Sequence, residues 1–358
     1  MLINLSLLMQ KPTGISTYAL NLVPHLLPHL AAFSPALLTT QGEKFPGFEI
    51  LATPANLTPE FGSRGHLARL WWTQTALPEL YRARRSRLIF SPVPEIPLWQ
   101  NCCTVAMVHD LIPLRFPRWN SPLTQYFRWV VPQVLRQAVH LVCNSESTAS
   151  DIMQLGGIRS DRITPIPLAY DAEHFRPLNL PRQNYFLYLG RQEGYKNLAP
   201  AIAALAQLAQ TDCELWIAGA PDPRFTPLLQ AQATELGLTE RVKFLAYVPY
   251  ADLPRLLNQA QALVFPSLWE GFGLPVLEAL GCGTPVIAGP VAALPEVGGE
   301  AVLWVDVREG GAIAAAMNRI LREPRLQQQL SEASLNQAQK FSWAKTGAQT
   351  AAVLERFG

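Results

Sequence analysis

Short apolar runs recur along the chain and alternate with longer stretches of helical hydrophobic period. The runs start with "MLINLSLLM" and continue with "RLIF" near 88, "TVAMVHD" near 104, "HLVCNS" near 140, "NYFLYLG" near 184, "CELWIAGA" near 213, "ALVFPS" near 262 and "TPVIAG" near 284. Strands that are buried on both faces of a parallel sheet show such continuous runs, and the helices between them cover the two faces. The pattern predicts an α/β fold with doubly wound parallel sheets.

The length of the chain favours two domains, because 358 residues exceed what one hydrophobic core usually supports. A proline-rich stretch without helical period, "PIPLAYDAEHFRPLNLPRQ" at residues 165–183, interrupts the alternation and is expected to join them. We therefore expect one domain over residues 1–170 and another over residues 171–341, followed by a helix-like segment from "FSWAKTG" to the end. Ligand-binding loops of such domains lie at the carboxyl ends of the strands, facing each other across a cleft.

Composition narrows the classes of function. Apolar residues make up 49% and charged residues 16%, which excludes a disordered chain, and the net charge of +2 gives no reason to expect nucleic acid as a partner. The five cysteines lack metal-ligand spacing and lie in apolar contexts, which suggests a reducing, cytoplasmic compartment. The apolar start lacks a basic n-region and is too short for a membrane span, so we expect it to form a buried strand.

The stretch "SLWEGFGLPVLEALGCGTPVIA" at residues 267–288 contains two glutamates, Glu270 and Glu278. In one continuous helix they would lie about 12 Å apart along the axis, too far to share a proton. Gly271, Gly273 and Pro275 instead predict a strand, a glycine loop and a helix start, with Glu270 on the loop and Glu278 in the first helical turn. Such a helix start presents backbone N–H groups to an anion. The alternative for Glu278 is an acid that the helix dipole favours.

Three further clusters follow predicted strands or precede helices. "YLGRQEGYKN" places Arg191 and Lys196 on a loop that suits a diphosphate, although a solvated loop is the simpler interpretation of the pair alone. "VAMVHDLIPLRFP" places His109 and Asp110 after a buried strand, where a structural histidine is the alternative. In "QKPTGIS", Gly14 would let backbone approach a phosphate, or would form a tight turn.

Absent motifs also limit the chemistry. The chain has no G-x-G-x-x-G, which weakens a dinucleotide-dependent oxidoreductase, and no G-x-x-x-x-G-K-[ST], which excludes a P-loop. It has no D-x-D that would supply paired carboxylates for a metal on a sugar nucleotide. An anionic donor would therefore be neutralised by Arg191, Lys196 and a helix terminus.

Together, "EGFGLPVLE", "GRQEGYKN", "VHD" and the terminal "FSWAKT" resemble the retaining glycosyltransferases of family 4, over essentially the whole chain. The resemblance implies the GT-B architecture, with two Rossmann-like domains facing across a cleft. Residues 1–170 would bind the acceptor and residues 171–341 the nucleotide-sugar donor. A C-terminal helix at about residues 342–358 would cross back to the first domain.

The resemblance also implies a role for each candidate residue. It assigns Arg191 and Lys196 to the donor diphosphate, Glu278 to the ribose hydroxyls and Glu270 to the transferred sugar, with His109 as an active-site histidine that contacts that sugar. The remaining donor-binding residues would act mainly through backbone: Gly271, Phe272, Gly273 and Leu274 near the sugar hydroxyls and β-phosphate, and Val248 in "FLAYVPY" near the base. Many relatives carry two or more glycines in the first loop, whereas here Gly14 stands alone, which weakens its assignment.

The implied reaction moves a hexose from a nucleotide diphosphate sugar to an acceptor hydroxyl with retention. No second acid suggests itself as the nucleophile of a double displacement, which favours a same-face mechanism in which the leaving phosphate helps to deprotonate the acceptor. We expect no metal and no cofactor, with UDP-glucose favoured as donor and GDP-mannose next. The alternatives are a GT-B sugar-nucleotide epimerase, which would need no acceptor, and a non-catalytic two-lobed sugar-binding protein.

Basic and aromatic residues mix in two segments of the first half, "RGHLARLWWTQTALPELYRARRSR" at residues 64–87 and "PLRFPRWNSPLTQYFRWVV". The first contains Arg64, Arg69, Arg82, Arg84, Arg85, Arg87, Trp71 and Trp72. Such segments can lie on anionic lipid, which would make the protein peripheral on the inner face of the cell membrane and suit a lipid-linked oligosaccharide acceptor for a cell-surface polysaccharide. The equally supported alternative is that helices bury the aromatic residues and leave the arginines in solvent.

Overall fold

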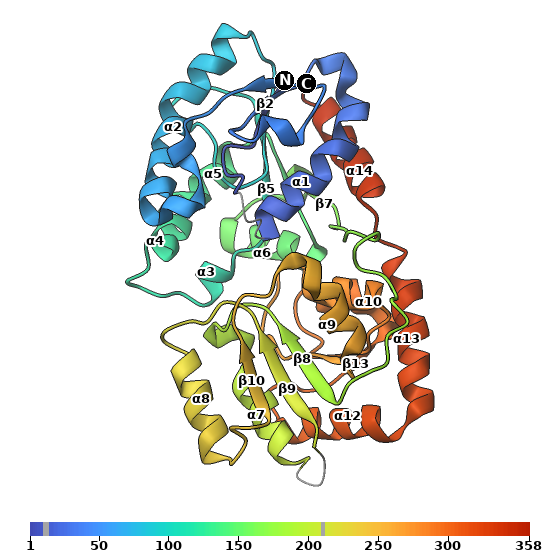
Figure 1. The fold of residues 1–358 in the computed structure, drawn as a ribbon. Helices are drawn as coiled ribbons and strands as arrows, with labels where there is room; N and C mark the ends of the chain where they lie inside the picture. Colours follow the sequence, from blue (N-terminus) through green and yellow to red (C-terminus); the bar gives the residue numbers. More distant parts are fainter. Residues whose placement is uncertain (10–13, 209–211) are drawn as a thin grey trace. The chain divides into compact units, whose positions relative to one another are not determined.

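The computed structural model describes residues 1–9, 14–208 and 212–358 (Figure 1). The chain divides into two compact units, which are described separately. Unit 1 consists of Met1–Leu168 and Ser342–Gly358, and unit 2 of Ala169–Phe341. The division falls at 168/169 and 341/342, where the sequence suggested 170/171 and 341/342. No described helix combines the length and the apolar character that a membrane crossing requires.

Unit 1 contains a seven-stranded sheet whose strands pair in parallel in the order β3-β2-β1-β4-β5-β6-β7. The strands are β1 (Leu2–Asn4), β2 (Ala36–Leu38), β3 (Glu49–Leu51), β4 (Ile89–Ser91), β5 (Thr104–Val108), β6 (His140–Cys143) and β7 (Ile163–Pro165). The order reverses between β1 and β4. Ligands of doubly wound sheets bind at the carboxyl ends of the strands beside such a reversal.

Unit 2 repeats this order in a six-stranded parallel sheet, β10-β9-β8-β11-β12-β13. Its strands are β8 (Tyr185–Leu189), β9 (Glu214–Ala218), β10 (Val242–Leu245), β11 (Leu263–Phe265), β12 (Val286–Ala288) and β13 (Val302–Trp304). The order reverses between β8 and β11. The loops that follow these two strands therefore flank the predicted ligand-binding edge of unit 2.

Helices cover both sheets (Figure 1). Those of unit 1 are α1 (Gly14–Leu26), α2 (Gly62–Ala83), α3 (Ile112–Arg115), α4 (Pro122–Trp129), α5 (Val131–Gln137), α6 (Glu146–Gly156) and α14 (Trp343–Glu355). Those of unit 2 are α7 (Leu198–Ala206), α8 (Thr226–Glu235), α9 (Leu253–Gln259), α10 (Leu274–Gly281), α11 (Leu294–Gly298), α12 (Gly310–Arg322) and α13 (Pro324–Ala338). Short 3-10 helices are η1 (Leu27–Phe33), η2 (Gly42–Lys44), η3 (Ala55–Leu57), η4 (Pro59–Phe61), η5 (Ser160–Arg162), η6 (Gly194–Lys196), η7 (Tyr250–Asp252) and η8 (Gly299–Ala301).

The C-terminal helix α14 belongs to unit 1, as the resemblance implied, and lies beside α1 (Figure 1). Ser342 caps its start by accepting a hydrogen bond from the Lys345 backbone N–H. A side chain at Gly347 would come within 2.6 Å of the His25 carbonyl oxygen, so a glycine is needed for the two helices to approach this closely.

The stretch that we expected to join the domains contains no helix or strand between β7 and β8, yet it is packed rather than free. Phe175 is buried in unit 2, and the Tyr170 ring lies where a side chain at Gly281 of α10 would be, at 2.3 Å. The joining segment therefore contributes to the core of unit 2.

Helix α2 differs from the expectation that its aromatic residues are buried and its arginines lie in solvent, because it places an arginine as well as a tryptophan in the core. Trp72 packs into a core cluster with Leu2, Leu77 and Ile89, and Arg69 is only 6% exposed. The Arg69 guanidinium forms two hydrogen bonds to Glu95, Nε to Oε2 at 2.7 Å and Nη2 to Oε1 at 2.8 Å. Burial alone would raise the pKa of Glu95, but the facing guanidinium holds it below its ordinary value. Arg69 and Trp72 thus face inward because they complete the core under α2.

We predict that Arg69→Met destabilises unit 1 far more than Arg84→Met. Arg69→Met leaves the buried Glu95 carboxylate without its partner, which costs about 3–5 kcal/mol in free energy of unfolding. Arg84 forms an ion pair with Glu49 on the surface, where loss of a partner costs about 1 kcal/mol or less. Urea denaturation followed by circular dichroism measures both, and equal shifts in the two variants would contradict the prediction.

Candidate functional site

The loops after β8 and β11 are joined by a buried ion pair. Lys196 Nζ lies 2.6 Å from Glu270 Oε1, and the two residues are 9% and 8% exposed. The Leu268 backbone N–H also donates to the Tyr195 carbonyl oxygen at 2.8 Å. Two charged residues that were predicted from separate motifs therefore meet at the reversal of strand order in unit 2.

The two cations of "GRQEGYKN" have different surroundings. Lys196 is held by Glu270, and its Nζ lies over the rings of Tyr195 and Phe265, at 5.0 Å and 5.5 Å from their centroids, within the range of a cation–π contact. The Arg191 side chain is 76% exposed, and its nearest carboxylate, that of Glu193, is 3.8 Å away. Arg191 is therefore free to move toward an anion, whereas Lys196 is fixed in place.

The glycine loop before α10 has a conformation that requires glycine at one position. Gly273 has φ of +103° and precedes the first helical residue, Leu274, and a side chain there would meet Leu294 at 2.6 Å. Phe272 is buried and its ring packs edge-on against Phe341 at 6.0 Å. The loop backbone at residues 271–274 is thereby anchored on both sides.

Glu278 is not in the first turn of α10, contrary to the prediction. Because Gly273 ends the loop and the helix begins at Leu274, Glu278 is the fifth helical residue and lies in the second turn. It is partly buried, and its carboxylate has no ion-pair or hydrogen-bond partner among the residues that the structure describes. Burial raises the pKa of the Glu278 carboxyl to about 8. Without a ligand the carboxyl is therefore mostly protonated at neutral pH, and ligand hydroxyls that donated to it would stabilise its charged form.

Sequence reasoning missed Gln192, which is 2% exposed between Arg191 and Glu193. Its amide accepts a hydrogen bond from the Thr226 hydroxyl at 2.7 Å and donates to the Gly219 carbonyl oxygen at 3.4 Å. Gly219 has φ of +143°, and a side chain on it would come within 2.0 Å of the Gly190 carbonyl oxygen. The sequence contained a signal for this close backbone approach, because a glycine directly follows each of the strands β8 and β9.

Two other residues lie on loops at this edge of unit 2. Val248 lies, partly buried, on the loop after β10, as expected. Ser267, two residues after β11, is fully buried, and its hydroxyl has no partner among the described residues. Nothing in the sequence distinguished this serine from others in loops.

His109 follows β5 in unit 1 and is held in one tautomer. Its Nε2 lies 2.9 Å from the Pro92 carbonyl oxygen, which can only accept, so Nε2 carries the proton and Nδ1 is the acceptor. Burial lowers the pKa of His109 to about 4, although the bond to Pro92 opposes the shift, and the ring is therefore neutral at neutral pH. The Tyr18 ring contacts it edge-on at 4.8 Å.

Two residues beside His109 were not predicted. Asn144 donates from Nδ2 to the His109 carbonyl oxygen at 2.9 Å, while its Oδ1 and the Tyr18 hydroxyl are buried without a partner among the described residues.

Gly14 begins α1, is exposed, and has no atom within 4 Å of where a side chain would start. Residues 10–13, which precede it in the same motif, lie outside the described residues, and its phosphate contact stays a prediction.

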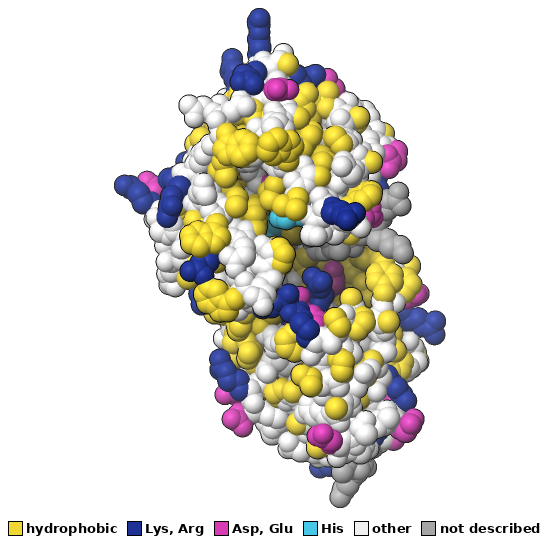
Figure 2. All heavy atoms as spheres, turned by 90° about the vertical axis from the view of Figure 1, so that its left-hand side faces the viewer, with side chains coloured by type: hydrophobic (Ala, Val, Ile, Leu, Met, Phe, Trp, Pro, Cys, Tyr) yellow, Lys and Arg dark blue, Asp and Glu magenta, His cyan; other side chains and the backbone are white. Residues whose placement is uncertain are grey.

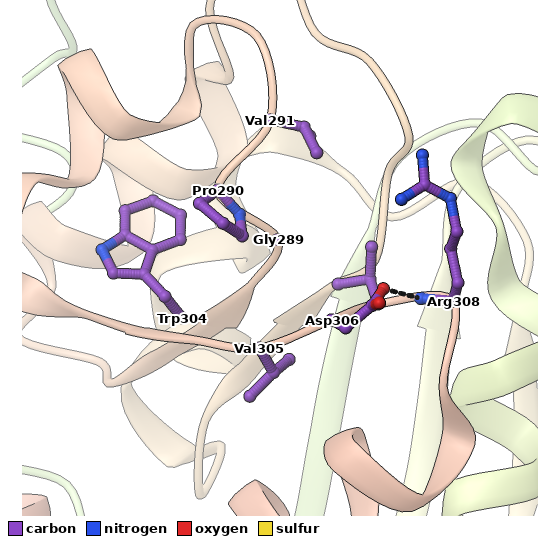
Figure 3. A pocket seen from close by; sticks show the side chains of 8 residues that line it. Gly289, Pro290, Val291, Trp304, Val305, Asp306 and Arg308 are labelled. Carbon is purple, nitrogen blue, oxygen red and sulfur yellow. Dashed lines mark hydrogen bonds between the residues drawn. The ribbon is translucent and has the colours of Figure 1, made fainter.

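A pocket of about 420 Å³ lies elsewhere on unit 2, beyond the carboxyl ends of β12 and β13. It is lined by Gly289, Pro290, Val291, Trp304, Val305, Asp306, Val307 and Arg308 (Figure 3). Asp306 accepts a hydrogen bond from the Arg308 backbone N–H at 3.0 Å, the contact that Figure 3 marks. None of the predicted residues lines this pocket. Within the described part of the chain, no group of three or more His, Cys, Asp or Glu side chains is placed to hold a metal ion.

Comparison with known proteins identifies relatives over both units. The family model described as "Glycosyltransferase Family 4" matches residues 12–174, and that described as "Glycosyl transferases group 1" matches residues 171–337. The chain is 30% identical over 269 residues to O-antigen chain mannosyltransferase B of Escherichia coli, covering 69% of this chain and 68% of that protein. It is 25% identical over 331 residues to O-antigen chain mannosyltransferase RfbU of Salmonella typhimurium, covering 90% and 92%.

A solved structure shares the fold over nearly the whole chain. HepE of Anabaena, in complex with UDP-glucose, superimposes with a TM-score of 0.75 at 18% identity, covering 99% of both chains. Together with the two parallel sheets described above, this likeness confirms the predicted GT-B architecture.

We predict that Glu278→Gln changes how stability depends on pH. The folded carboxyl, with a pKa of about 8 against an ordinary value of 4.5, holds its proton more tightly than the unfolded one, so the wild-type protein loses stability as pH rises from about 4.5 to about 8. The variant lacks this loss and should melt at least about 4 °C higher than wild type at pH 9, with a smaller difference at pH 5. Calorimetry at both pH values measures it, with the exposed Glu300→Gln as control. A Glu278→Gln difference that is the same at both pH values would refute the prediction.

Proposed function

Since the chain belongs to the group 1 and family 4 glycosyltransferases, we propose that it transfers a hexose from a nucleotide diphosphate sugar to an acceptor hydroxyl with retention at the anomeric carbon. The observation that carries this proposal is the buried Lys196–Glu270 pair between the loops after β8 and β11. It supplies a fixed cation and a fixed carboxylate next to the start of α10.

Departure of a diphosphate builds negative charge on the leaving oxygen, and three features of unit 2 would stabilise it. Lys196 has three ammonium protons, so it can bond a phosphate oxygen while it keeps Glu270. The exposed Arg191 can add a planar fork. The amides of Gly273 and Leu274 precede the first helical bond, which Val276 donates to the Gly273 carbonyl oxygen, and they lie at the positive end of α10.

The other residues would hold the donor rather than react. Glu278 would accept hydrogen bonds from the ribose hydroxyls, and Glu270 would face the hydroxyls of the transferred sugar. His109 is neutral with Nδ1 as its acceptor, which suits contact with a sugar hydroxyl and not the role of a cationic acid. With Glu270 already bound to Lys196, we favour a same-face displacement in which the leaving phosphate takes the acceptor proton, without a metal ion.

Two sugar nucleotides, GDP-mannose and UDP-glucose, are candidates for the donor. The sequence relatives are named as mannosyltransferases of O-antigen chains, which favours GDP-mannose. The expectation of UDP-glucose rests on weaker support, because HepE was solved with UDP-glucose but is only 18% identical. For the acceptor, we propose a saccharide chain of a cell-envelope polysaccharide, carried on a lipid.

A donor screen tests the proposed function. The purified chain is incubated with GDP-mannose, UDP-glucose and ADP-glucose, with and without EDTA, and nucleoside diphosphate release and the anomeric configuration of any product are followed by NMR. We expect release from one donor, an α-linked product from an α-donor and no effect of EDTA. Conversion of the donor to another sugar nucleotide without acceptor would indicate an epimerase. Binding of a free sugar without any turnover would indicate a sugar-binding protein.

We predict that Arg191→Met and Lys196→Met both weaken nucleoside diphosphate binding, by about 10-fold or more, because each removes a charge-assisted hydrogen bond. Only Lys196→Met should also lower the melting temperature, since it leaves Glu270 buried without a partner. The double variant Lys196→Met/Glu270→Gln should recover stability but not affinity. Calorimetric titration measures the affinity, with Arg308→Met as the control for an exposed cation on another loop of this edge. Wild-type affinity in both single variants would refute the assignment.

A further inference from the structure

Four tryptophans of unit 1, Trp71, Trp99, Trp119 and Trp129, are each more than 60% exposed. Three exposed arginines accompany them: Arg64, Arg118 and Arg128. We call the surface formed by these seven residues the aromatic-basic face. Figure 2 views this side of unit 1, on which α2 and α4 lie, and shows apolar side chains gathered there. Large exposed apolar patches usually mark a binding surface.

Helix α2 contributes one side of the aromatic-basic face. Arg64, Leu67 and Trp71 are spaced by three and four residues, so they lie along one stripe of the helix, and Leu67 is also exposed. The buried Arg69 and Trp72 point the other way, into the core. The mixed sequence of α2 therefore resolves into an inner side and an outer side.

The loop after β4 presents Trp99 against this stripe. The Trp71 and Trp99 rings meet edge-on with centroids 5.9 Å apart. Gln74 of α2 fixes the loop by donating to the Ile96 carbonyl oxygen at 2.9 Å and accepting from the Leu98 backbone N–H at 2.7 Å. Trp99 is thus held against Trp71 of α2 by a loop that two hydrogen bonds fix in place.

The second part of the aromatic-basic face lies on α4 and the segment before it. The Arg128 guanidinium stacks over both Trp119 and Trp129, at 4.8 Å and 5.0 Å from the ring centroids. Contact between His66 of α2 and Tyr126 of α4, with centroids 5.0 Å apart, places this helix next to the stripe on α2.

The charge of the aromatic-basic face is of one sign. The sequence has no Asp or Glu between Glu60 and Glu79, and none between Asp110 and Glu146. Arg64, Arg118 and Arg128 form no ion pair within the described residues. Exposed arginines without acidic neighbours attract an anionic surface, and indole rings prefer the boundary between water and hydrocarbon.

From this combination we propose that the aromatic-basic face docks unit 1 on an anionic lipid bilayer. A site for a soluble glycan needs convergent groups that bond hydroxyls, whereas this face offers arginines, indoles, Leu67 and Leu123, and no carboxylate. The tryptophan side chains would insert at the boundary between headgroups and acyl chains, while the arginines bind the lipid phosphates. The proposal rests on the proposed function only for its purpose, which is to bring a lipid-carried acceptor to the enzyme.

Vesicle sedimentation tests the proposal. The wild-type chain should bind vesicles of phosphatidylcholine with about 30% phosphatidylglycerol at low salt, bind pure phosphatidylcholine weakly, and show a blue shift of tryptophan emission on binding. Arg64→Gln/Arg118→Gln/Arg128→Gln should lower the partition coefficient by about 100-fold, because each arginine near the surface contributes about 5-fold. Trp71→Ser/Trp129→Ser should remove most of the blue shift and weaken binding by at least about 10-fold.

Two controls separate this face from general charge and hydrophobicity. Arg82→Gln/Arg85→Gln/Arg87→Gln removes the same charge from exposed sites at and beyond the C-terminal end of α2, where Arg82 lies about 27 Å along the helix from Arg64, and should retain binding. Leu228→Ser removes an exposed apolar side chain from unit 2 and should also retain it. No binding of wild type to anionic vesicles, equal losses in face and control variants, or competition by a soluble glycan or RNA in place of lipid binding would overturn the proposal. Nucleotide affinity in solution should be unchanged in every face variant, so failure here is distinct from failure of the proposed function.

Discussion

The ion pair between Lys196 and Glu270 joins the two loops on which the candidate site of unit 2 depends. The loop after β8 carries the cations, and the loop after β11 carries the carboxylate and the glycines that lead into α10. These loops are neighbours only because the strand order reverses between β8 and β11. A buried pair is weak as a source of stability, since desolvation offsets much of the attraction. Its structural effect is to hold both charges in fixed positions between the two loops, as the proposed donor site requires.

In both units a buried glutamate follows the strand that stands fourth in the order of the sheet. In unit 1 it is Glu95, after β4, and in unit 2 it is Glu270, after β11. Glu95 is enclosed by Arg69 from a preceding helix and serves to tie down its loop. Glu270 is bound by a lysine with a single contact and is followed by a glycine-rich helix start. The same topology therefore yields a pair that ties down a loop in unit 1 and, in unit 2, the pair on which the proposed donor site depends.

The sequence predicted the α/β class and the strands before the main candidate residues, because β5, β8 and β11 are buried and lie inside their sheets. It missed strands at sheet edges, such as β3, β7 and β13, because partial exposure there breaks the continuous apolar run that marks a central strand. It placed Glu278 one turn too early, since the left-handed conformation of Gly273 decides where α10 begins. The partners of His109 and Gln192 come from distant segments, and no local pattern reveals such contacts.

Helix α2 shows why composition alone does not predict which side chains of a helix are exposed. Arginine and tryptophan occur on both sides of this helix, and only tertiary contacts separate Arg69 and Trp72 inside from Arg64 and Trp71 outside. On the inner side, Glu95 binds Arg69 and the apolar cluster takes up Trp72. On the outer side, Gln74 holds the loop that carries Trp99. The aromatic-basic face is a consequence of how the core of unit 1 is closed.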